Sequence, residues 1–421
     1  MRSNIVALSS LILSAHVALA QNPPAAGAAP AAEPPIRLAP PDSQITAMVA
    51  RLDLEKYKAT VKGLTQFGDR RQGTKRNRDA VDWIEAQLKS YGCTNTERIT
   101  YDYQPPPPRA PNANPAGRAG GAGAAGRGGI QNAGQGGSRM RGNRARTGVN
   151  TDSLAQTDLK LRALNSEPTT PGQRQEVYCT KVGATHPEEM YIVAGHMDGH
   201  GWGEAANDDG SGTALVMELA RIFSSPDVVT DRSIRFALWN NEETGLNGAR
   251  AYVAQRQALQ GIENPRGSGK YPEPKWLGMI QHDMMMFDHG MPNADGTMRK
   301  EQRAEADVNV EFQMQSKMAF ESMKLAFYFR DANERYATDY PAAVGPHMTN
   351  TDSSPFMELI PAISLRENER GMHIGAGWDP QWHQVTDVYS TYSDADFRLG
   401  LNAAQTTLSA IAQLTGARFK Q

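Results

Sequence analysis

Cysteine is nearly absent from this 421-residue chain, which contains only Cys93 and Cys179. So few thiols make thiol catalysis a poor hypothesis. Each cysteine lies in or beside a segment with a strand pattern, 93–103 and 175–182. If those strands are neighbours a disulfide is feasible, and the sequence leaves the pairing open.

The chain also lacks a charge excess of either sign. It carries 44 Lys and Arg against 46 Asp and Glu, a formal net charge of -2. Such a balance gives no overall reason to expect nucleic acid or a membrane surface as a partner.

Long apolar runs are missing except at the N-terminus, where Arg2 precedes the run 5–20 that ends in Ala-Leu-Ala. A charged start, an apolar middle and a small-residue exit are typical of a secretory signal peptide. We therefore expect residues 1–20 to be removed and the protein to be exported, either periplasmic or secreted. The alternative is a membrane anchor, but the run is shorter than the roughly 20 apolar residues that span a bilayer. No other segment is long enough, so no membrane association is expected after cleavage.

Two segments have almost no large apolar side chains. Residues 21–41 are rich in Pro and Ala, and the insertion 105–150 is rich in Gly and Arg, with seven arginines and no acid between 105 and 147. Such segments cannot bury enough surface to offset the entropy of ordering them. We expect a disordered lead-in and a disordered surface loop. An RGG-like contact with a polyanion is the alternative for the loop, although no nucleic-acid partner is expected.

The rest of the chain has regular patterns. Between 43 and 88 apolar residues recur at helical spacing, and after 170 short apolar runs alternate with helical patterns. This alternation predicts an α/β fold with a mostly parallel central sheet flanked by helices on both faces. We expect a single domain over 42–421, interrupted by the insertion.

Metal-competent side chains follow three of the predicted strands. The strand 191–196 ends on His196, the strand from 233 leads into Glu242 and Glu243, and the strand 275–283 ends on Asp283. Ligands gather beyond the carboxyl ends of parallel strands. The stretch GHMDGHGWGEAANDDGSG (195–212) adds further acids and a second histidine at the same edge. Oxygen and nitrogen ligands without thiolates favour a hydrolytic zinc, cobalt or manganese centre.

Five motifs, GHMD, AANDDGSG, NNEETGLNGAR, QHD and WHQVTD, resemble in order and spacing those of the di-zinc exopeptidases typified by secreted bacterial leucine aminopeptidases. That family also holds glutamate carboxypeptidases, glutaminyl cyclases and the transferrin receptor. The resemblance covers about 45–104 and 170–415 and implies the zinc-exopeptidase architecture. It implies two Zn²⁺, or Co²⁺ or Mn²⁺, one held by His196, Asp208 and Asp283 and the other by Asp208, Glu243 and His383.

The resemblance also assigns roles. Asp208, rather than Asp209, bridges the ions, and the peptide link that follows it is typically cis in the family. Glu242 acts as general base and acid for a metal-bridging hydroxide. Asp198 sits behind His196 and fixes its ring. The implied activity is aminopeptidase cleavage of a peptide or protein substrate, because no arginine cluster for a substrate carboxylate is identifiable.

Alternatives remain open at this point. A carboxypeptidase, a one-zinc cyclase-like acyltransferase or a non-catalytic binding protein could share the fold. His373 competes with His383 as the last ligand. Ser353 stands where the family often has histidine, which puts Asp352 in doubt as a site residue. The stretch 290–345 either caps the pocket or extends the core, and the interval that holds a protease-associated domain in some members is too poor in apolar residues to fold as one.

Other residues near these motifs could have either a structural role or a role in the site. His282 neighbours Asp283 on a strand, so the two side chains point to opposite faces and His282 is expected to be structural. His200 either faces substrate or is a plain loop residue. Four apolar residues near the motifs could either line an apolar substrate pocket or belong to the protein core. They are Met284, Trp202, Trp378 and Trp382.

Overall fold

The computed structural model describes residues 40–105, 149–287, 308–346, 350–367 and 379–420. The predicted signal peptide, nearly all of the predicted lead-in and almost the whole Gly/Arg-rich insertion lie outside these ranges, so these three assignments stay predictions. The same holds for His373 and Trp378. Residues 41–421 form one compact unit. No helix in the described ranges is both long and apolar enough to cross a bilayer.

Helices form in the segments where the sequence pattern predicts them, and α5 (Leu159–Asn165) is a further helix that was not predicted. In chain order they are α1 (Ser43–Val49), α2 (Leu54–Thr65), α3 (Lys75–Ser90), α5 (Leu159–Asn165), α6 (Gly210–Phe223), α7 (Asn247–Arg256), α8 (Ala319–Tyr336) and α9 (Asp394–Thr415). Short 3-10 turns follow at η2 (Ser153–Ala155), η3 (Gln257–Leu259) and η4 (Tyr389–Thr391).

The strands are β1 (Thr96–Tyr103), β2 (Gly172–Lys181), β3 (His186–His196), β4 (Val228–Val229), β5 (Arg232–Trp239), β6 (Lys275–His282), β7 (Val308–Glu311), β8 (Ala342–Gly345), β9 (Ala362–Arg366) and β10 (Arg418–Phe419). Eight of them form one sheet in the order β1-β2-β5-β3-β6-β9-β7-β8, and β4 pairs with β10. The central run β5-β3-β6-β9 is parallel, whereas β1, β2 and β7 introduce antiparallel pairs. The predicted α/β class with a mostly parallel sheet is confirmed.

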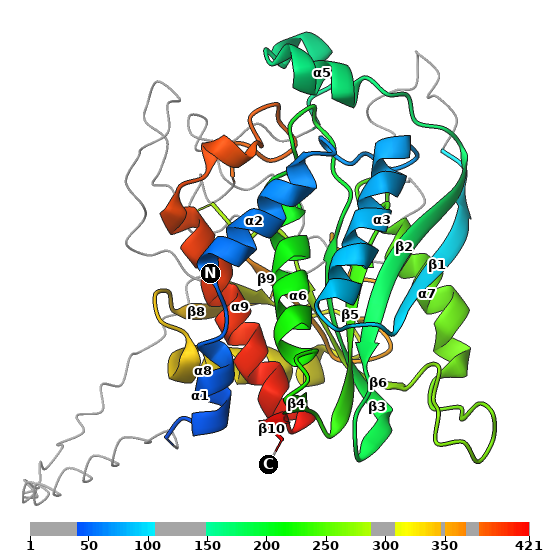
Figure 1. Cartoon of the computed structure of the whole chain (residues 1–421), viewed down its shortest axis with the longest axis vertical. Helices are drawn as coiled ribbons and strands as arrows, with labels where there is room; N and C mark the ends of the chain where they lie inside the picture. The colour runs from blue at the N-terminus through cyan, green and yellow to red at the C-terminus, as the bar shows by residue number, and fades with distance from the viewer. Residues whose placement is uncertain (1–39, 106–148, 288–307, 347–349, 368–378, 421) are drawn as a thin grey trace, which may run out of the picture. The chain divides into compact units, whose positions relative to one another are not determined.

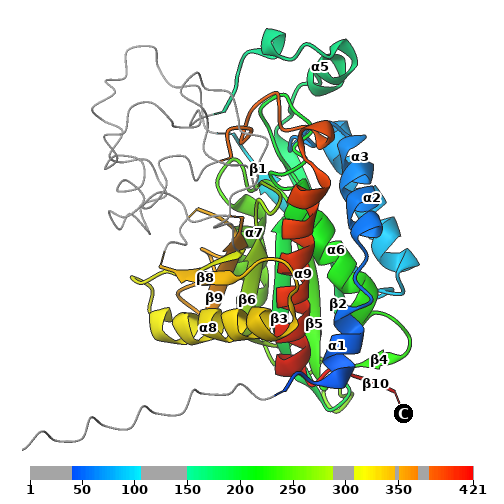
Figure 2. The same cartoon turned by 90° about the vertical axis from the view of Figure 1, so that its left-hand side faces the viewer.

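Each central strand is buried on both faces, as parallel strands between helical layers must be. On β5, Phe236 and Leu238 belong to the core under α2, α3, α6 and α9, while Trp239 belongs to a second core under α7. Figure 1 shows the first layer of helices over the sheet, and the rotated view in Figure 2 shows α7 on the opposite side. Helices therefore cover both faces, as predicted.

The stretch after 290 extends the core rather than standing apart from it. Strands β7 and β8 lengthen the sheet beyond β9, and α8 packs against α9. Buried side chains of α8, among them Leu325 and Phe329, join the larger core. Of the two alternatives for 290–345, the part that the structure describes, from residue 308 on, extends the core.

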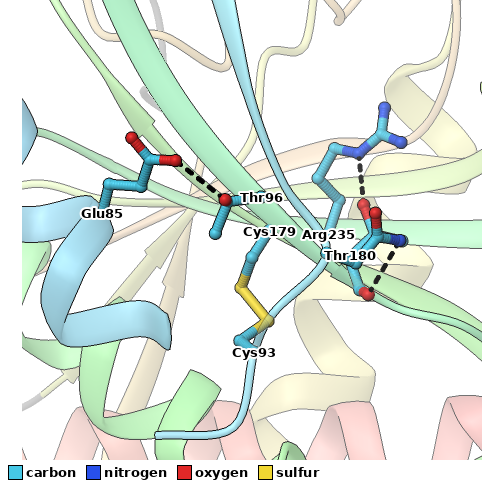
Figure 3. Close-up of a disulfide and its surroundings, with 7 residues drawn as sticks. Glu85, Cys93, Thr96, Cys179, Thr180 and Arg235 are labelled. Carbon is cyan, nitrogen blue, oxygen red and sulfur yellow. Dashed lines mark hydrogen bonds between the residues drawn. A yellow bond between two sulfur atoms is a disulfide. The ribbon is translucent and has the colours of Figure 1, made fainter. Parts of the chain in front are cut away.

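Cys93 and Cys179 form a disulfide, which resolves the open pairing. Figure 3 shows it joining the chain just before β1 to β2. Beside it, Glu85 on α3 accepts a hydrogen bond from the Thr96 hydroxyl of β1 at 2.9 Å. Helix α3 and the antiparallel β1–β2 edge are thus tied together covalently and by polar contacts.

Candidate metal centre

Three neighbouring parallel strands end at the same edge of the sheet. His196 is the last residue of β3, Glu242 and Glu243 follow β5 by a few residues, and Asp283 directly follows β6. Because β5, β3 and β6 are adjacent in the sheet, these side chains meet although they are far apart in sequence. The spatial gathering expected from the strand ends is what the structure shows.

The N-terminus of α6 supplies Asp208. The next residue, Asp209, caps this helix, because its carboxylate accepts from the backbone N–H of Gly212 at 2.8 Å and from that of His196 at 3.0 Å. Asp209 is therefore occupied by backbone donors, and Asp208 is the acid that faces the imidazoles. The Asp208–Asp209 peptide bond is cis, as the resemblance implied.

The side chains form two groups of three that meet at Asp208. In the first, His196, Asp208 and Asp283 offer ligand atoms within 4.8 Å of one another. In the second, His200, Glu243 and His383 do the same. Asp208 Oδ1 lies 3.3 Å from Nε2 of His196, and its Oδ2 lies 3.0 Å from Nε2 of His383. One carboxylate thus faces both groups, each through its own oxygen.

The electrostatics of the second group fit a cation. Burial lowers the pKa of His383, but Glu243 and Asp208 outweigh it and raise that pKa to about 10. For the carboxylate of Glu243 the directions are reversed: burial raises its pKa, but His200 and His383 outweigh burial and lower it to about 2. Carboxylates that favour the protonated form of a neighbouring imidazole would favour a divalent ion in the place of that proton. Buried Nε2 of His200 and Oε1 of Glu243 have no hydrogen-bond partner in the described residues, which leaves them available as ligands.

Glu242 lies beside this centre and belongs to neither group. It is buried, and burial raises its pKa well above the ordinary value; His196 opposes that shift and Asp352 adds to it. Its backbone N–H donates to Oδ1 of Asp198 at 3.0 Å. A carboxyl group with a raised pKa is suited to hold and release a proton.

Asp198 acts differently from the expected role. It does lie behind His196, but the atom 3.0 Å from Nδ1 is its backbone carbonyl oxygen, and the carboxylate is 3.9 Å away. A backbone carbonyl can accept the Nδ1 proton in place of a carboxylate, so the ring is still oriented with Nε2 toward the centre. The carboxylate of Asp198 is used to hold Glu242.

The loop that carries His383 is braced from two sides. Asp387 accepts from the backbone N–H of Asn207 at 2.8 Å and of Asp208 at 3.1 Å. Across the loop, the backbone N–H of Asn150 donates to the carbonyl of His383 at 2.9 Å. Gln156 bridges the loops of Trp202 and Val385 with bonds of 2.9 and 3.0 Å. The sequence did not predict the part of this brace that comes from Asn150, at the end of the Gly/Arg-rich insertion, and from Gln156 shortly after it.

Backbone strain marks the same edge. Asn241, Met284 and His383 have φ values of 63°, 63° and 58°, in the left-handed region that side chains other than glycine rarely adopt. His383 is a ligand candidate, Met284 follows the ligand candidate Asp283, and Asn241 precedes the proposed general base Glu242. Strain of this kind persists where the surroundings fix the conformation, and it clusters at functional sites.

Arg366 is a buried residue of the site that sequence reasoning missed. It is the last residue of β9, and its Nη2 lies 3.0 Å from Oδ2 of Asp283. Its Nε lies 3.4 Å from Oε2 of Glu311 on β7. The only signal in the sequence was an arginine directly after the apolar run of β9.

The remaining predicted residues divide between core and rim. His282 is structural, as expected, because Nδ1 contacts the carbonyl of Ala194 at 3.0 Å and Nε2 contacts the Thr407 hydroxyl at 2.8 Å. Met284 is buried but belongs to neither of the two hydrophobic cores, and the rings of Trp382 and His383 lie side by side, tilted at 32°, with centroids 4.2 Å apart. Ser353 bonds Ser364, while neighbouring Asp352 is fully buried close enough to raise the pKa of Glu242.

Part of this chain matches a known protein family. The family model described as "Peptidase family M28" matches residues 176–406. Aminopeptidase YwaD of Bacillus subtilis is 43% identical over 68 residues, 16% of this chain and 14% of that protein. Carboxypeptidase Q of Xenopus laevis is 37% identical over 71 residues, 17% of this chain and 15% of that protein. The chain thus spans well under two thirds of these relatives.

The fold has a solved counterpart. An aminopeptidase from Aneurinibacillus sp. strain AM-1 superposes with a TM-score of 0.56 over 90% of this chain and 97% of that one. The two sequences are 19% identical, so the match speaks for the fold alone.

Proposed function

This chain belongs to peptidase family M28, and from that premise we propose that it is an exported di-zinc aminopeptidase. The observation that carries the proposal is Asp208, whose two oxygens face two separate sets of metal-competent side chains. An acid placed in this way is what a pair of adjacent cations requires.

The first ion would be held by His196, Asp208 and Asp283, and the second by Asp208, Glu243 and His383. Nitrogen and oxygen donors without sulfur suit Zn²⁺, with Co²⁺ or Mn²⁺ as substitutes. When bound, such ions lower the pKa of water and polarise a substrate carbonyl. Three ligand carboxylates do not neutralise two divalent cations, so the site stays electrophilic.

Glu242 would move the proton in peptide hydrolysis. Its carboxylate takes a proton from the attacking water and delivers it to the leaving nitrogen, which departs as the free amine when the C–N bond breaks. Asp198 keeps Glu242 in place through the backbone bond of 3.0 Å. A raised pKa makes the protonated form accessible at the step where it must act as an acid.

The arginines near the centre favour an aminopeptidase over a carboxypeptidase. A carboxypeptidase needs a free cation for the terminal carboxylate of its substrate. Arg366 is already compensated by Asp283 and Glu311, and Arg70 donates to the backbone carbonyls of Met197, Glu204 and Ala205. Both of these buried arginines already face oxygen atoms of the chain itself.

Substrate assays separate these possibilities. Aminoacyl-nitroanilides with a free amino group should be hydrolysed, while their N-acetylated counterparts and N-blocked dipeptides with a free carboxylate should not. Preference for the N-blocked dipeptides would favour the carboxypeptidase alternative. Formation of pyroglutamyl peptides from N-terminal glutamine would favour the cyclase alternative.

Export is part of the same proposal. The signal-like residues 1–20 support it, and so does the Cys93–Cys179 disulfide, since such bonds persist in oxidising compartments. Expression of the whole chain in a bacterial host, followed by N-terminal sequencing of the periplasmic and medium fractions, tests it. The expected N-terminus is Gln21, and retention of intact chain in the cytoplasm would contradict export.

A further inference from the structure

His200 is held against the metal centre by the two glycines beside it. A Cβ on Gly199 would lie 2.9 Å from the carbonyl oxygen of Asp208, and one on Gly201 would collide with the carbonyl of His383. Gly201 also has φ +99°, which a side chain rarely tolerates. The loop therefore packs backbone to backbone against two residues that carry predicted ligands, and this packing fixes the position of His200.

The His200 ring faces the second group of ligands. Its Nε2 lies 3.0 Å from Oε2 of Glu243, and the same oxygen lies 2.9 Å from Nε2 of His383. The two imidazoles stand at 89° with ring centroids 4.1 Å apart. Three donor atoms from three separate segments thus surround one point.

Nε2 of His200 and Oε2 of Glu243 are 3.0 Å apart but do not meet in hydrogen-bond geometry. Although Nε2 of His200 is close to Glu243, it is buried and has no hydrogen-bond partner in the described residues. The second oxygen of Glu243 is likewise buried without one. A histidine that merely supported Glu243 would point an N–H at it, whereas unpartnered donor atoms directed at a common point are typical of a ligand set.

We propose that Nε2 of His200 is a ligand of the second ion, beside Asp208, Glu243 and His383, an assignment that rests on the two-ion site proposed above. The second ion then has four protein ligands and the first has three. A four-ligand zinc site is closed and binds tightly, while a three-ligand site keeps a position open for water or substrate. The second site should therefore fill first, and the ion held by His196 and Asp283 should be the exchangeable one.

Zinc affinity of variants tests this ordering in solution. Competition with a graded chelator, followed by metal analysis of the protein, should show two zinc ions per wild-type chain with the second site the tighter. His200→Ala and the bulkier His200→Gln should each weaken one ion by at least about 100-fold, beyond the effect of a group that only orients a ligand. His383→Ala should weaken the same ion, and His186→Ala, which alters an exposed histidine, should match wild type.

A crystal structure of the zinc-loaded wild type, with data at the zinc absorption edge, tests the ligand directly and needs no variant to fold. Nε2 of His200 should lie about 2.0–2.1 Å from the second ion. Two bound ions with that nitrogen beyond about 3 Å, or His200 variants with wild-type affinity, would overturn the assignment and leave the proposed function intact. A wild type that binds fewer than two ions would overturn the two-ion function and this assignment together.

Discussion

Arg366 at the end of β9 places its Nη2 3.0 Å from Oδ2 of Asp283 at the end of β6, and both residues are buried. Burial raises the pKa of Asp283, but Arg366 and then His196 outweigh it and hold that pKa well below its usual range. The arginine thus keeps a candidate metal ligand ionised. It also links the metal-binding edge to Glu311 on β7.

Replacing Arg366 with Met should destabilise the protein by about 3–5 kcal/mol, because Asp283 and Glu311 would lose the buried cation that they share. Urea denaturation of the metal-free protein measures the free energy of unfolding. The double variant Arg366→Met/Glu311→Gln should recover part of the loss, since one of the two charges is gone. A single variant within about 0.5 kcal/mol of wild type, a typical surface effect, would show that the pair contributes little.

The brace behind His383 should affect metal binding from a distance. Gln156→Ala removes the bonds of Nε2 to the carbonyls of Trp202 and Val385, so the loops that carry His200 and His383 lose a common anchor. We expect zinc affinity to fall about 10-fold, as for other groups that orient ligands. Gln255→Ala, which removes an exposed bond to Thr100, is the matched control and should change nothing. Equal zinc affinities in the two variants would refute the bracing role.

The disulfide should contribute strongly to stability. Cys93 and Cys179 are 86 residues apart, so their bond removes much freedom from the unfolded chain. The Cys93→Ala/Cys179→Ala variant should lose about 2–5 kcal/mol of unfolding free energy. Guanidinium denaturation measures the loss, and wild type denatured with a reductant present should show the same midpoint as the variant. Unchanged stability in both would mean that the bond contributes nothing.

Acid should weaken the contact between α3 and β1. Burial raises the pKa of Glu85, but bonds from Lys89, Arg98 and Thr96 outweigh it and lower the pKa to about 2. Because the folded pKa lies below the ordinary 4.5, this stabilisation is complete above about pH 4.5 and disappears as the pH falls toward 2. Unfolding free energies between pH 6 and 2 should fall less steeply for Glu85→Gln than for wild type. Parallel curves would contradict the assigned shift.

Much of the metal-binding edge was predictable because its signals are local. β3 ends on His196, β6 ends directly before Asp283 and β5 ends a few residues before Glu243, and parallel strands bring such ends together. The family resemblance of the motifs is confirmed by the match over 176–406. The roles of the individual ligands stay predictions until metal is observed.

The parts that sequence reasoning missed depend on long-range packing. Arg366 reaches Asp283 only because β9 pairs with β6, and Glu311 reaches Arg366 only through the antiparallel pairing of β7 with β9. The disulfide depends on the pairing of β1 with β2, which the sequence could not settle. The contact of Asp198 with His196 is made by its carbonyl oxygen rather than by the predicted carboxylate, which a sequence pattern does not distinguish.

We propose that bound metal and Glu242 together hydrolyse peptides. Hydrolysis of leucyl-nitroanilide by the chain from Gln21 is the most direct test of this proposal. Activity should disappear on chelation and return with zinc. Glu242→Gln should bind two zinc ions as wild type does but lose about 10²–10⁴-fold in kcat, the usual contribution of a general base. A wild type loaded with two zinc ions that hydrolyses neither amino- nor carboxypeptidase substrates, or a fully active Glu242→Gln variant, would contradict the account.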